Sequence, residues 1–307
     1  MRIVIALGGN ALLARGEKPD AAIQLHHVRA AAEALAPLAA DHELVICHGN
    51  GPQVGLLALE SQADPSLSRP YPLDVLGAQT QGMIGYWLAQ SLRNAGVRRP
   101  VLAIVTQTVV DAADPAFATP TKFVGPVYSE GEGRRLAETH GWRIAADGAH
   151  WRRVVASPEP LRLVEADSVA RLVDAGTVVV CGGGGGAPVV DDGHGRLNGV
   201  EAVVDKDLTA ALLAIDLKAD RLVLLTDVPA VVRDFGTTNA QPLPILDLDE
   251  LAHLEFAAGS MGPKVEACRR FVAATGHAAA IGSLTAAAAV LDGTEGTTVV
   301  SAPTTSP

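Results

Sequence analysis

Short apolar runs alternate along the chain with longer segments of helical spacing. Apolar residues continue through each short run and do not alternate with polar ones, as in strands that are buried on both faces of a sheet. The six runs cover residues 2–7, 43–47, 101–105, 177–181, 222–225 and 278–281. Alanine- and leucine-rich segments between them predict helices over residues 21–40, 77–94, 165–174, 207–217 and 263–275. This order of elements predicts an α/β protein with a largely parallel sheet.

Residues 111–160 interrupt this alternation with five prolines. Inside this segment, Asp147-Gly148 lies between two tryptophan-containing runs, a pattern typical of a β-hairpin. We therefore expect a small subdomain, called the insertion below, between two strands of the sheet. A closed (β/α)8 barrel would fit the chain length and stays the alternative fold, although the insertion argues against it.

Net charge and hydropathy exclude several classes of protein. The 307 residues are 48% hydrophobic and carry a formal charge of -10, which argues against a protein that coats nucleic acid or an anionic membrane. No apolar stretch approaches the roughly 18 residues of a membrane span. The apolar run at the N-terminus is too short for a secretory signal, so the expected location is the cytoplasm.

The chain has three cysteines, Cys47, Cys181 and Cys268. They lie far apart and form no C-x-x-C motif, so neither a disulfide framework nor a zinc site is indicated. Buried, unreactive thiols are expected.

Small, polar or glycine residues follow all six predicted strands. Ligands of open parallel sheets bind beyond the carboxyl ends of the strands, and glycine there lets backbone N–H groups approach phosphate oxygens. The turns are Gly8-Gly9-Asn10, His48-Gly49-Asn50-Gly51, Thr106-Gln107-Thr108, the glycines of 182–186, Thr226-Asp227 and Gly282-Ser283. Several such turns in one sheet predict an anion-binding crevice.

The common phosphate and hydrolase motifs do not explain these turns. The sequence contains no G-x-x-x-x-G-K-[ST], which excludes a P-loop. Gly182, Gly184 and Ala187 satisfy G-x-G-x-x-A, but Pro188 follows where the dinucleotide fold needs a helix. Residues 258–262 resemble a nucleophile elbow, yet the segment before them has a helical pattern and not that of a strand.

Three lysines stand in unusual settings: Lys122, Lys206 and Lys264. Phosphoryl transfer passes through a highly charged transition state and needs cations near the phosphoryl oxygens. A solvated surface charge is the alternative reading of each lysine. That reading fits Lys206 least well because Asp205 and Asp207 flank it at a predicted helix start, where Asp207 can cap the helix and hold an ammonium group.

Seven segments of the chain together resemble the signatures of the carbamate kinases, within the amino acid kinase superfamily. They begin at Gly8 (GGNAL), His48 (HGNGPQVG), Thr106 (TQT), Pro120 (PTK, with GPVY at 125–128), Gly199 (GVEAVVDKD), Leu225 (LTDV) and Gly259 (GSMGPKVEA). The similarity runs from residue 2 to about residue 300. It departs from the family pattern at Phe123 and Ala156, where proline is expected, and at Val232, where many relatives have tyrosine.

The resemblance implies a three-layer α/β/α sandwich with a central, mostly parallel eight-stranded sheet. It implies a single domain over residues 1–307, with an N-lobe of residues 1–200 for the phosphoryl acceptor and a C-lobe of residues 201–307 for the nucleotide. The insertion at about 111–160 would protrude from the N-lobe and close over the acceptor. A homodimer is implied as well.

The resemblance also assigns roles to residues. The catalytic residues would be Lys122, Lys206, Asp207 and Lys264. The residues that bind carbamoyl phosphate would be Gly8, Gly9, Asn10, Gly49, Asn50 and Gly51. The residues that line the nucleotide would be Thr226, Asp227, Ser260, Met261 and Gly262. Magnesium would arrive with ATP, without a metal site made by the protein.

The implied reaction is reversible phosphoryl transfer between ATP and carbamate, with ATP formed during arginine catabolism by the arginine deiminase pathway. Neither nucleic acid nor a membrane is an expected partner. Another amino acid kinase activity, such as acetylglutamate phosphorylation, is one alternative, and the insertion with Lys122 argues against it. A non-catalytic nucleotide-binding module is the other, and the three lysines with Asp207 argue against it.

Overall fold

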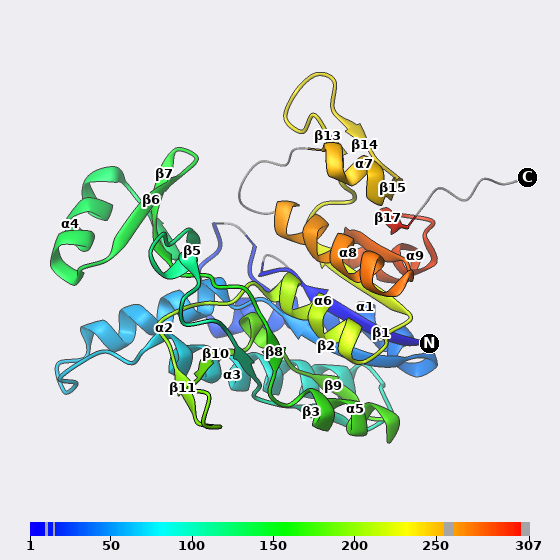
Figure 1. Ribbon diagram of the computed structural model, residues 1–307, viewed down its shortest axis with the longest axis horizontal. Coiled ribbons are helices and arrows are strands. Elements are labelled where there is room, and N and C mark those ends of the chain that lie inside the picture. Colours follow the sequence, from blue (N-terminus) through cyan, green and yellow to red (C-terminus); the bar gives the residue numbers. More distant parts are fainter. Residues whose placement is uncertain (10–11, 15, 255–260, 302–307) are drawn as a thin grey trace, which may run out of the picture.

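An open eight-stranded sheet forms the centre of the molecule (Figure 1). The computed structural model describes residues 1–9, 12–14, 16–254 and 261–301. The strands follow one another across the sheet in the order β15 (Ile245–Asp247), β17 (Thr297–Val300), β16 (Ala279–Ser283), β12 (Arg221–Thr226), β1 (Arg2–Leu7), β2 (Glu43–His48), β9 (Val178–Val180) and β3 (Val101–Ala103). Only β16 and β17 pair antiparallel within this described sheet. The predicted open, mostly parallel sheet is confirmed, and the barrel alternative is wrong because β15 and β3 are separate edges.

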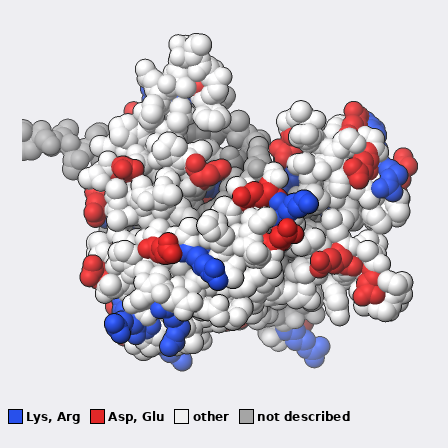
Figure 2. All heavy atoms as spheres, turned by 180° about the vertical axis from the view of Figure 1, so that it is seen from behind, with Lys and Arg blue, Asp and Glu red and all other residues white. Residues whose placement is uncertain are grey.

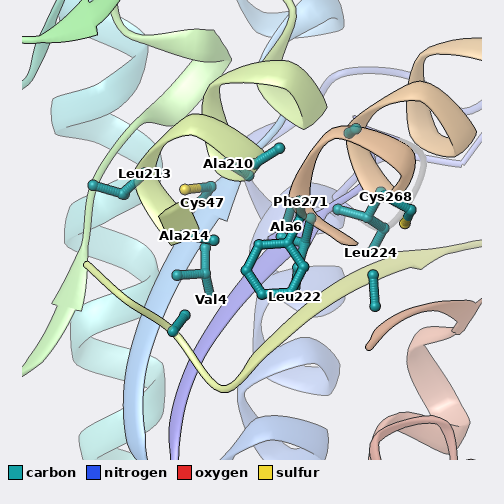
Figure 3. Packing of buried hydrophobic residues seen from close by; sticks show 14 of the residues in the cluster. Val4, Ala6, Cys47, Ala210, Leu213, Ala214, Leu222, Leu224, Cys268 and Phe271 are labelled. Carbon is teal, nitrogen blue, oxygen red and sulfur yellow. The ribbon is translucent and has the colours of Figure 1, made fainter. Parts of the chain in front are cut away.

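Helices cover both faces of this sheet. Strand β1 shows why its residues are apolar throughout: Ile3, Ile5 and Leu7 belong to one buried cluster, and Val4 and Ala6 to another. The first cluster lies against α1 (Ala21–Asp41), α3 (Leu73–Asn94) and α9 (Ala287–Asp292). The second lies against α5 (Ala166–Asp174), α6 (Lys206–Asp216), α7 (Leu248–His253) and α8 (Met261–Thr275), and Figure 3 shows side chains from α6, α8 and the strands beneath them. The predicted three-layer sandwich is therefore confirmed.

A second, four-stranded sheet lies beside the central one. Its order is β11 (Leu197–Gly199), β10 (Ala187–Asp191), β4 (Gln107–Val109) and β8 (Arg162–Leu163). The predicted strand over residues 101–105 is too long, because β3 ends at Ala103 and the chain enters this second sheet at Gln107. A strand and not a helix follows the glycine run of 182–186, which excludes a dinucleotide-binding turn there.

The insertion forms an antiparallel sheet with one helix. Its elements are β5 (Lys122–Tyr128), α4 (Glu130–His140), β6 (Arg143–Asp147) and β7 (His150–Val155), and Figure 1 shows α4, β6 and β7 projecting away from the central sheet. Asp147 pairs with His150 across the predicted hairpin turn, where Gly148 has a φ of 62°.

The insertion packs on helix α2 (Gly51–Ala63). Val124 and Val155 of the insertion join Val54 of α2 in a small buried cluster. A Cβ atom on Gly55 would lie 2.0 Å from Cα of Gly125, so the two backbones approach each other as only glycines allow.

The remaining elements are short. They are β13 (Val232–Arg233), β14 (Gln241–Pro242) and the 3-10 turns η2 (Pro115–Phe117), η3 (Gly183–Gly185) and η4 (Leu284–Ala286). All three cysteines are buried free thiols, as predicted. Within the described ranges, no helix combines the length and the apolar character that crossing a membrane requires.

Candidate active site

Two glycine turns meet at the carboxyl ends of β1 and β2. The amide of Gly8 donates to the carbonyl of Leu225 at 2.8 Å, and the amide of Gly49 donates to the carbonyl of Leu7 at 2.9 Å. A Cβ atom on Gly49 would lie 2.8 Å from the nitrogen of Gly9 and 3.4 Å from Cε of Lys206. The turns predicted to bind the acceptor are thus in direct contact with each other and with one of the predicted catalytic lysines.

Gly9 and Gly51 are less closely approached by the described residues than Gly49 is. Neither has a left-handed backbone. Among the described residues, the atom nearest to a Cβ on Gly9 belongs to Pro52, at 3.9 Å, and a Cβ on Gly51 would meet none of them within 4 Å. Within the part of the chain that the structure describes, both positions therefore have space for a methyl group.

Helix α6 begins beside these turns, and Asp205 is its N-cap. One carboxylate oxygen of Asp205 accepts hydrogen bonds from the amides of Asp207 and Leu208 at 2.9 and 3.3 Å. The sequence-based expectation that Asp207 caps this helix is wrong, because the helix starts one residue earlier, at Lys206. Asp207 instead points at two ammonium groups.

Asp207 lies between Lys206 and Lys264. Its Oδ1 atom is 2.6 Å from Nζ of Lys206, and its Oδ2 atom is 3.1 Å from Nζ of Lys264. The three side chains are largely buried, with exposed fractions of 11%, 4% and 10% for Lys206, Asp207 and Lys264. On the face of the molecule in Figure 2, by contrast, Lys and Arg side chains occur at the surface in small groups, several with Asp or Glu beside them.

The two lysines respond differently to this shared partner. Burial lowers the pKa of Lys206, and the charge of Lys264 lowers it further against the opposing effect of Asp207. Burial would also lower the pKa of Lys264, but the hydrogen bond and charge of Asp207 hold that pKa above its ordinary value. Burying these ammonium groups costs desolvation energy, which the nearby carboxylates do not fully offset at Lys206, so this cluster is better explained by binding of an anion than by stability.

Lys122 reaches the same place from the insertion. Its ammonium group forms an ion pair with the second carboxylate oxygen of Asp205. Burial would raise the pKa of Asp205, but the charges of Lys122 and Lys206 keep it well below its ordinary value. The structure thus gathers three predicted catalytic cations around the first turn of α6.

The glycine run of 182–186 packs against the second turn. A Cβ atom on Gly183 would lie 2.4 Å from the ring of His48, and one on Gly184 would lie 2.1 Å from Nδ2 of Asn50. Asn50 donates to Oγ1 of Thr80 at 2.8 Å. Burial lowers the pKa of His48 to about 4. The charge of Lys206 lowers this pKa further, and the hydrogen bond to Gly49 opposes both effects. His48 is therefore neutral at physiological pH.

The described residues predicted to line the nucleotide lie at the carboxyl end of β12 and at the start of α8. Thr226 ends strand β12, and its hydroxyl donates to the carboxylate of Asp227 at 3.0 Å. Asp227 also raises the pKa of Lys264 through its charge, after the larger effects of burial and Asp207. Met261 and Gly262 form the start of α8, the helix of Lys264. Asn10 and Ser260 lie outside the described residues.

The positions that depart from the family pattern have ordinary packing roles. The guanidinium group of Arg152 lies 5.6 Å from the ring centre of Phe123, in a cation–π contact. Ala156 forms a bridge to Ala202, and Val232 pairs with Pro242 in the β13–β14 hairpin. None of these contacts involves a lysine of the site.

Comparison with known proteins agrees with this geometry. The model of the amino acid kinase family matches residues 1–283. A carbamate kinase of Rhizobium meliloti (strain 1021) is 51% identical over 304 residues, which cover 98% of this chain and 94% of that protein. A carbamate kinase from Giardia lamblia bound to citric acid has a TM-score of 0.93 and 40% identity, and one bound to AMP-PNP has a TM-score of 0.88 and 40% identity. Both alignments cover 98% of each chain.

The family match extends over most of the chain, and the identities far exceed what a shared fold alone would give. The solved structures above share both layers of helices and the central sheet with this chain over nearly their full length. The chain is therefore a kinase of the amino acid kinase family, and within that family it belongs to the carbamate kinases.

Proposed function

We propose that this protein catalyses the reversible transfer of a phosphoryl group between ATP and carbamate. The observation that supports this most directly is the position of Lys206, Asp207 and Lys264 beside the turns of Gly9 and Gly49. Buried cations next to open backbone turns suit a charged phosphoryl group in transit. The names of the relatives above supply the acceptor.

The proposed chemistry needs charge neutralisation and no proton acceptor. A carbamate oxygen attacks the γ-phosphorus of ATP while the bond from that phosphorus to its bridging oxygen breaks, giving carbamoyl phosphate and ADP. Carbamate is already an anion, so no side chain has to remove a proton. This fits a site with three lysines in which the nearby His48 is buried and neutral. Lys206 and Lys264 would offset the charge on the transferred group, and Lys122 would approach it from the acceptor side.

We assign the two substrates to opposite sides of this cluster. The turns at Gly8, Gly9, Gly49, Asn50 and Gly51 would hold carbamoyl phosphate within the N-lobe, residues 1–200. The nucleotide would lie in the C-lobe, residues 201–307, along Thr226, Asp227, Met261 and Gly262. The AMP-PNP-bound relative supports a nucleotide site in this fold.

Magnesium is proposed to enter as the complex of the nucleotide. Both carboxylate oxygens of Asp207 face ammonium groups, which makes this residue a partner for lysines. Among the described residues, no group of three or more His, Cys, Asp or Glu side chains is placed to hold a metal ion. The phosphate oxygens of ATP would coordinate the Mg²⁺ ion in place of protein side chains.

A homodimer is part of the same proposal. Strand β3 is an edge of the described central sheet; Leu102 within it is 45% exposed, and Val105, just after it, is 49% exposed. Tyr86 of the neighbouring helix α3 is 58% exposed. Pairing of two such edges would bury these apolar side chains. We further propose that the enzyme works in the cytoplasm and makes ATP in arginine catabolism by the arginine deiminase pathway.

The test is a coupled assay that detects ATP formed from ADP, Mg²⁺ and carbamoyl phosphate. ATP formation at a rate of at least about 1 per second per active site, the low end of ordinary enzymes, is the expected result. Absence of ATP, or a faster reaction between ATP and N-acetylglutamate than between ATP and carbamate, would overturn the proposal. Sedimentation of the purified protein as a monomer at assay concentrations would remove the dimer from it.

A further inference from the structure

One ion pair ties the insertion to the helix that carries the catalytic charges. Lys122 stands at the start of β5, and its partner Asp205 lies 83 positions later in the chain, directly before α6. The side chain of Lys122 is 33% exposed and that of Asp205 is 11% exposed. The pair is therefore partly shielded from water, where an ion pair is stronger than at an open surface.

The carboxylate of Asp205 is held in a fixed orientation. Its Oδ1 atom accepts the amides of Asp207 and Leu208 at the first turn of α6, which leaves Oδ2 for Lys122. The direction of Oδ2 is thus set by the helix and not by the flexible lysine. The charge of Lys206, the first residue of α6, also acts on this carboxylate.

The insertion also contacts the rest of the chain elsewhere. The amide of Val203 donates to the carbonyl of Ala156 at 2.9 Å, directly after β7, which pairs with β5. This contact and those below place the backbone of the insertion and not the ammonium group of Lys122. Val124 and Val155 pack on α2 through apolar surfaces, and apolar contacts are not directional. Arg153 lies 3.4 Å from Glu201, a largely exposed partner. Arg270 of α8 pairs with Glu159, which follows the last strand of the insertion.

We propose that Asp205 is a positioning residue: it holds Lys122, and the insertion with it, at the N-terminus of α6 in the geometry that receives the phosphoryl acceptor. The proposal deepens the phosphotransferase function proposed above and rests on it for its kinetic consequence. Asp205 acts through Lys122 and does not itself contact the substrate. Its second task, capping α6, is separable because it uses the other oxygen atom.

Asp205→Asn separates the two tasks. Asparagine caps helices as well as aspartate does, so α6 keeps its N-cap, while the charge that holds Lys122 is lost. We expect the KM for carbamoyl phosphate to rise about tenfold, equivalent to about 1.4 kcal/mol, and the KM for ADP to change much less. A fall in kcat with both KM values unchanged is what a loosened helix alone would produce, and it would overturn the proposal.

A double-mutant cycle with Lys122→Met tests the path of the effect. If Asp205 acts through Lys122, then Asp205→Asn causes no further rise in the KM for carbamoyl phosphate once Lys122 is methionine. An equal fold rise in both backgrounds would show that Asp205 acts through Lys206 or the helix, and would overturn the proposal. Glu159→Gln is the matched control, since it breaks another ion pair of the insertion without touching Lys122, and it should leave both KM values near those of the parent.

A distance measurement tests the same proposal without activity. The native cysteines are buried, so spin labels can be directed to Glu138→Cys on α4 and Asp216→Cys on α6, both exposed positions. Pulsed electron paramagnetic resonance should give one narrow distance distribution for the parent and Glu159→Gln, and a broader, longer one for Asp205→Asn. An unchanged distribution in Asp205→Asn would contradict the proposal, even if the protein made no ATP and the proposed function itself had failed.

Discussion

The two carboxylate oxygens of Asp207 are divided between Lys206 and Lys264, at 2.6 and 3.1 Å from their Nζ atoms. A single buried carboxylate therefore sets the separation of two cations before any ligand arrives. Charges that are already in place need no reorganisation when charge develops on the phosphoryl group, which is the main source of electrostatic catalysis. Asp207 is thus a shared partner of both lysines.

Replacing that partner should expose the repulsion between the lysines. Asp207→Asn keeps the side-chain volume but offers one acceptor oxygen and an NH2 group that faces an ammonium group. We expect the free energy of unfolding to fall by about 3–5 kcal/mol, the cost of breaking a buried ion pair on one side. Urea denaturation of the parent and the variant measures this difference.

The second lysine supplies the check on this interpretation. Lys264→Met in the Asp207→Asn background removes one of the two ammonium groups that lost the charge of Asp207, so part of the lost stability should return. Additive losses in the double variant would show that the two side chains do not interact as the distances indicate.

The contrast between Gly9 and Gly49 gives a prediction about the first turn. Gly9→Ala should unfold at nearly the temperature of the parent, because among the described residues the added methyl group comes no closer than 3.9 Å, to Pro52. The methyl group would project where the acceptor is proposed to bind, so the KM for carbamoyl phosphate should rise and kcat should fall. Thermal unfolding and steady-state kinetics on the same preparation separate stability from binding.

Gly49→Ala is the matched control for this pair. Its methyl group would lie 2.8 Å from the nitrogen of Gly9, so the backbone must shift and the free energy of unfolding should fall by about 1–3 kcal/mol. A stable Gly49→Ala protein, or a Gly9→Ala enzyme that is destabilised but kinetically normal, would contradict the described geometry of the turn.

His48 should make stability depend on pH between about 6.5 and 4. Its pKa is lowered to about 4 by burial in the folded protein, whereas the unfolded chain has the ordinary value of 6.5. The stabilising contribution is fully present above pH 6.5 and is lost as the pH falls toward 4, because only the unfolded chain takes up the proton. Between pH 7.5 and pH 5 this amounts to about 2 kcal/mol.

Urea denaturation at those two pH values, for the parent and for His48→Gln, isolates this contribution. Glutamine cannot titrate, so the parent should lose about 2 kcal/mol more than the variant on acidification. Equal losses in the two proteins would mean that His48 is not buried in its neutral form.

The sequence predicts the central sheet well because its strands are buried on both faces. The runs at residues 2–7 and 222–225 need no alternation, and they are apolar throughout except for Arg2 at the start of the first. The four-stranded second sheet was not predicted, since β8 and β11 have two and three residues, too short for any periodicity. Helix α3 starts at Leu73 and not at residue 77, because Leu73 and Leu76 pack on the insertion, a contact that local patterns do not reveal.

Some features of the candidate site could likewise be predicted from the sequence, and others could not. Glycine turns at strand ends and lysines in unusual settings are local features, so they could be identified from the sequence. The role of Asp205 could not, because its partner Lys122 lies 83 positions away and only the folded chain brings them together. Whether Asp205 or Asp207 caps the helix depends on a shift of two residues in the helix start, and helix propensities do not resolve so small a shift.

ATP formation from ADP, Mg²⁺ and carbamoyl phosphate should be compared between the parent and Lys206→Ala. Calorimetry on both proteins should measure the binding of ADP. The parent should form ATP, and kcat of the variant should be lower by about a hundredfold or more, the scale of one lost preorganised charge contact. The KM values and the affinity for ADP should change little. A variant with near-parental kcat would contradict the central claim that the lysines around Asp207 act on the transferred phosphoryl group.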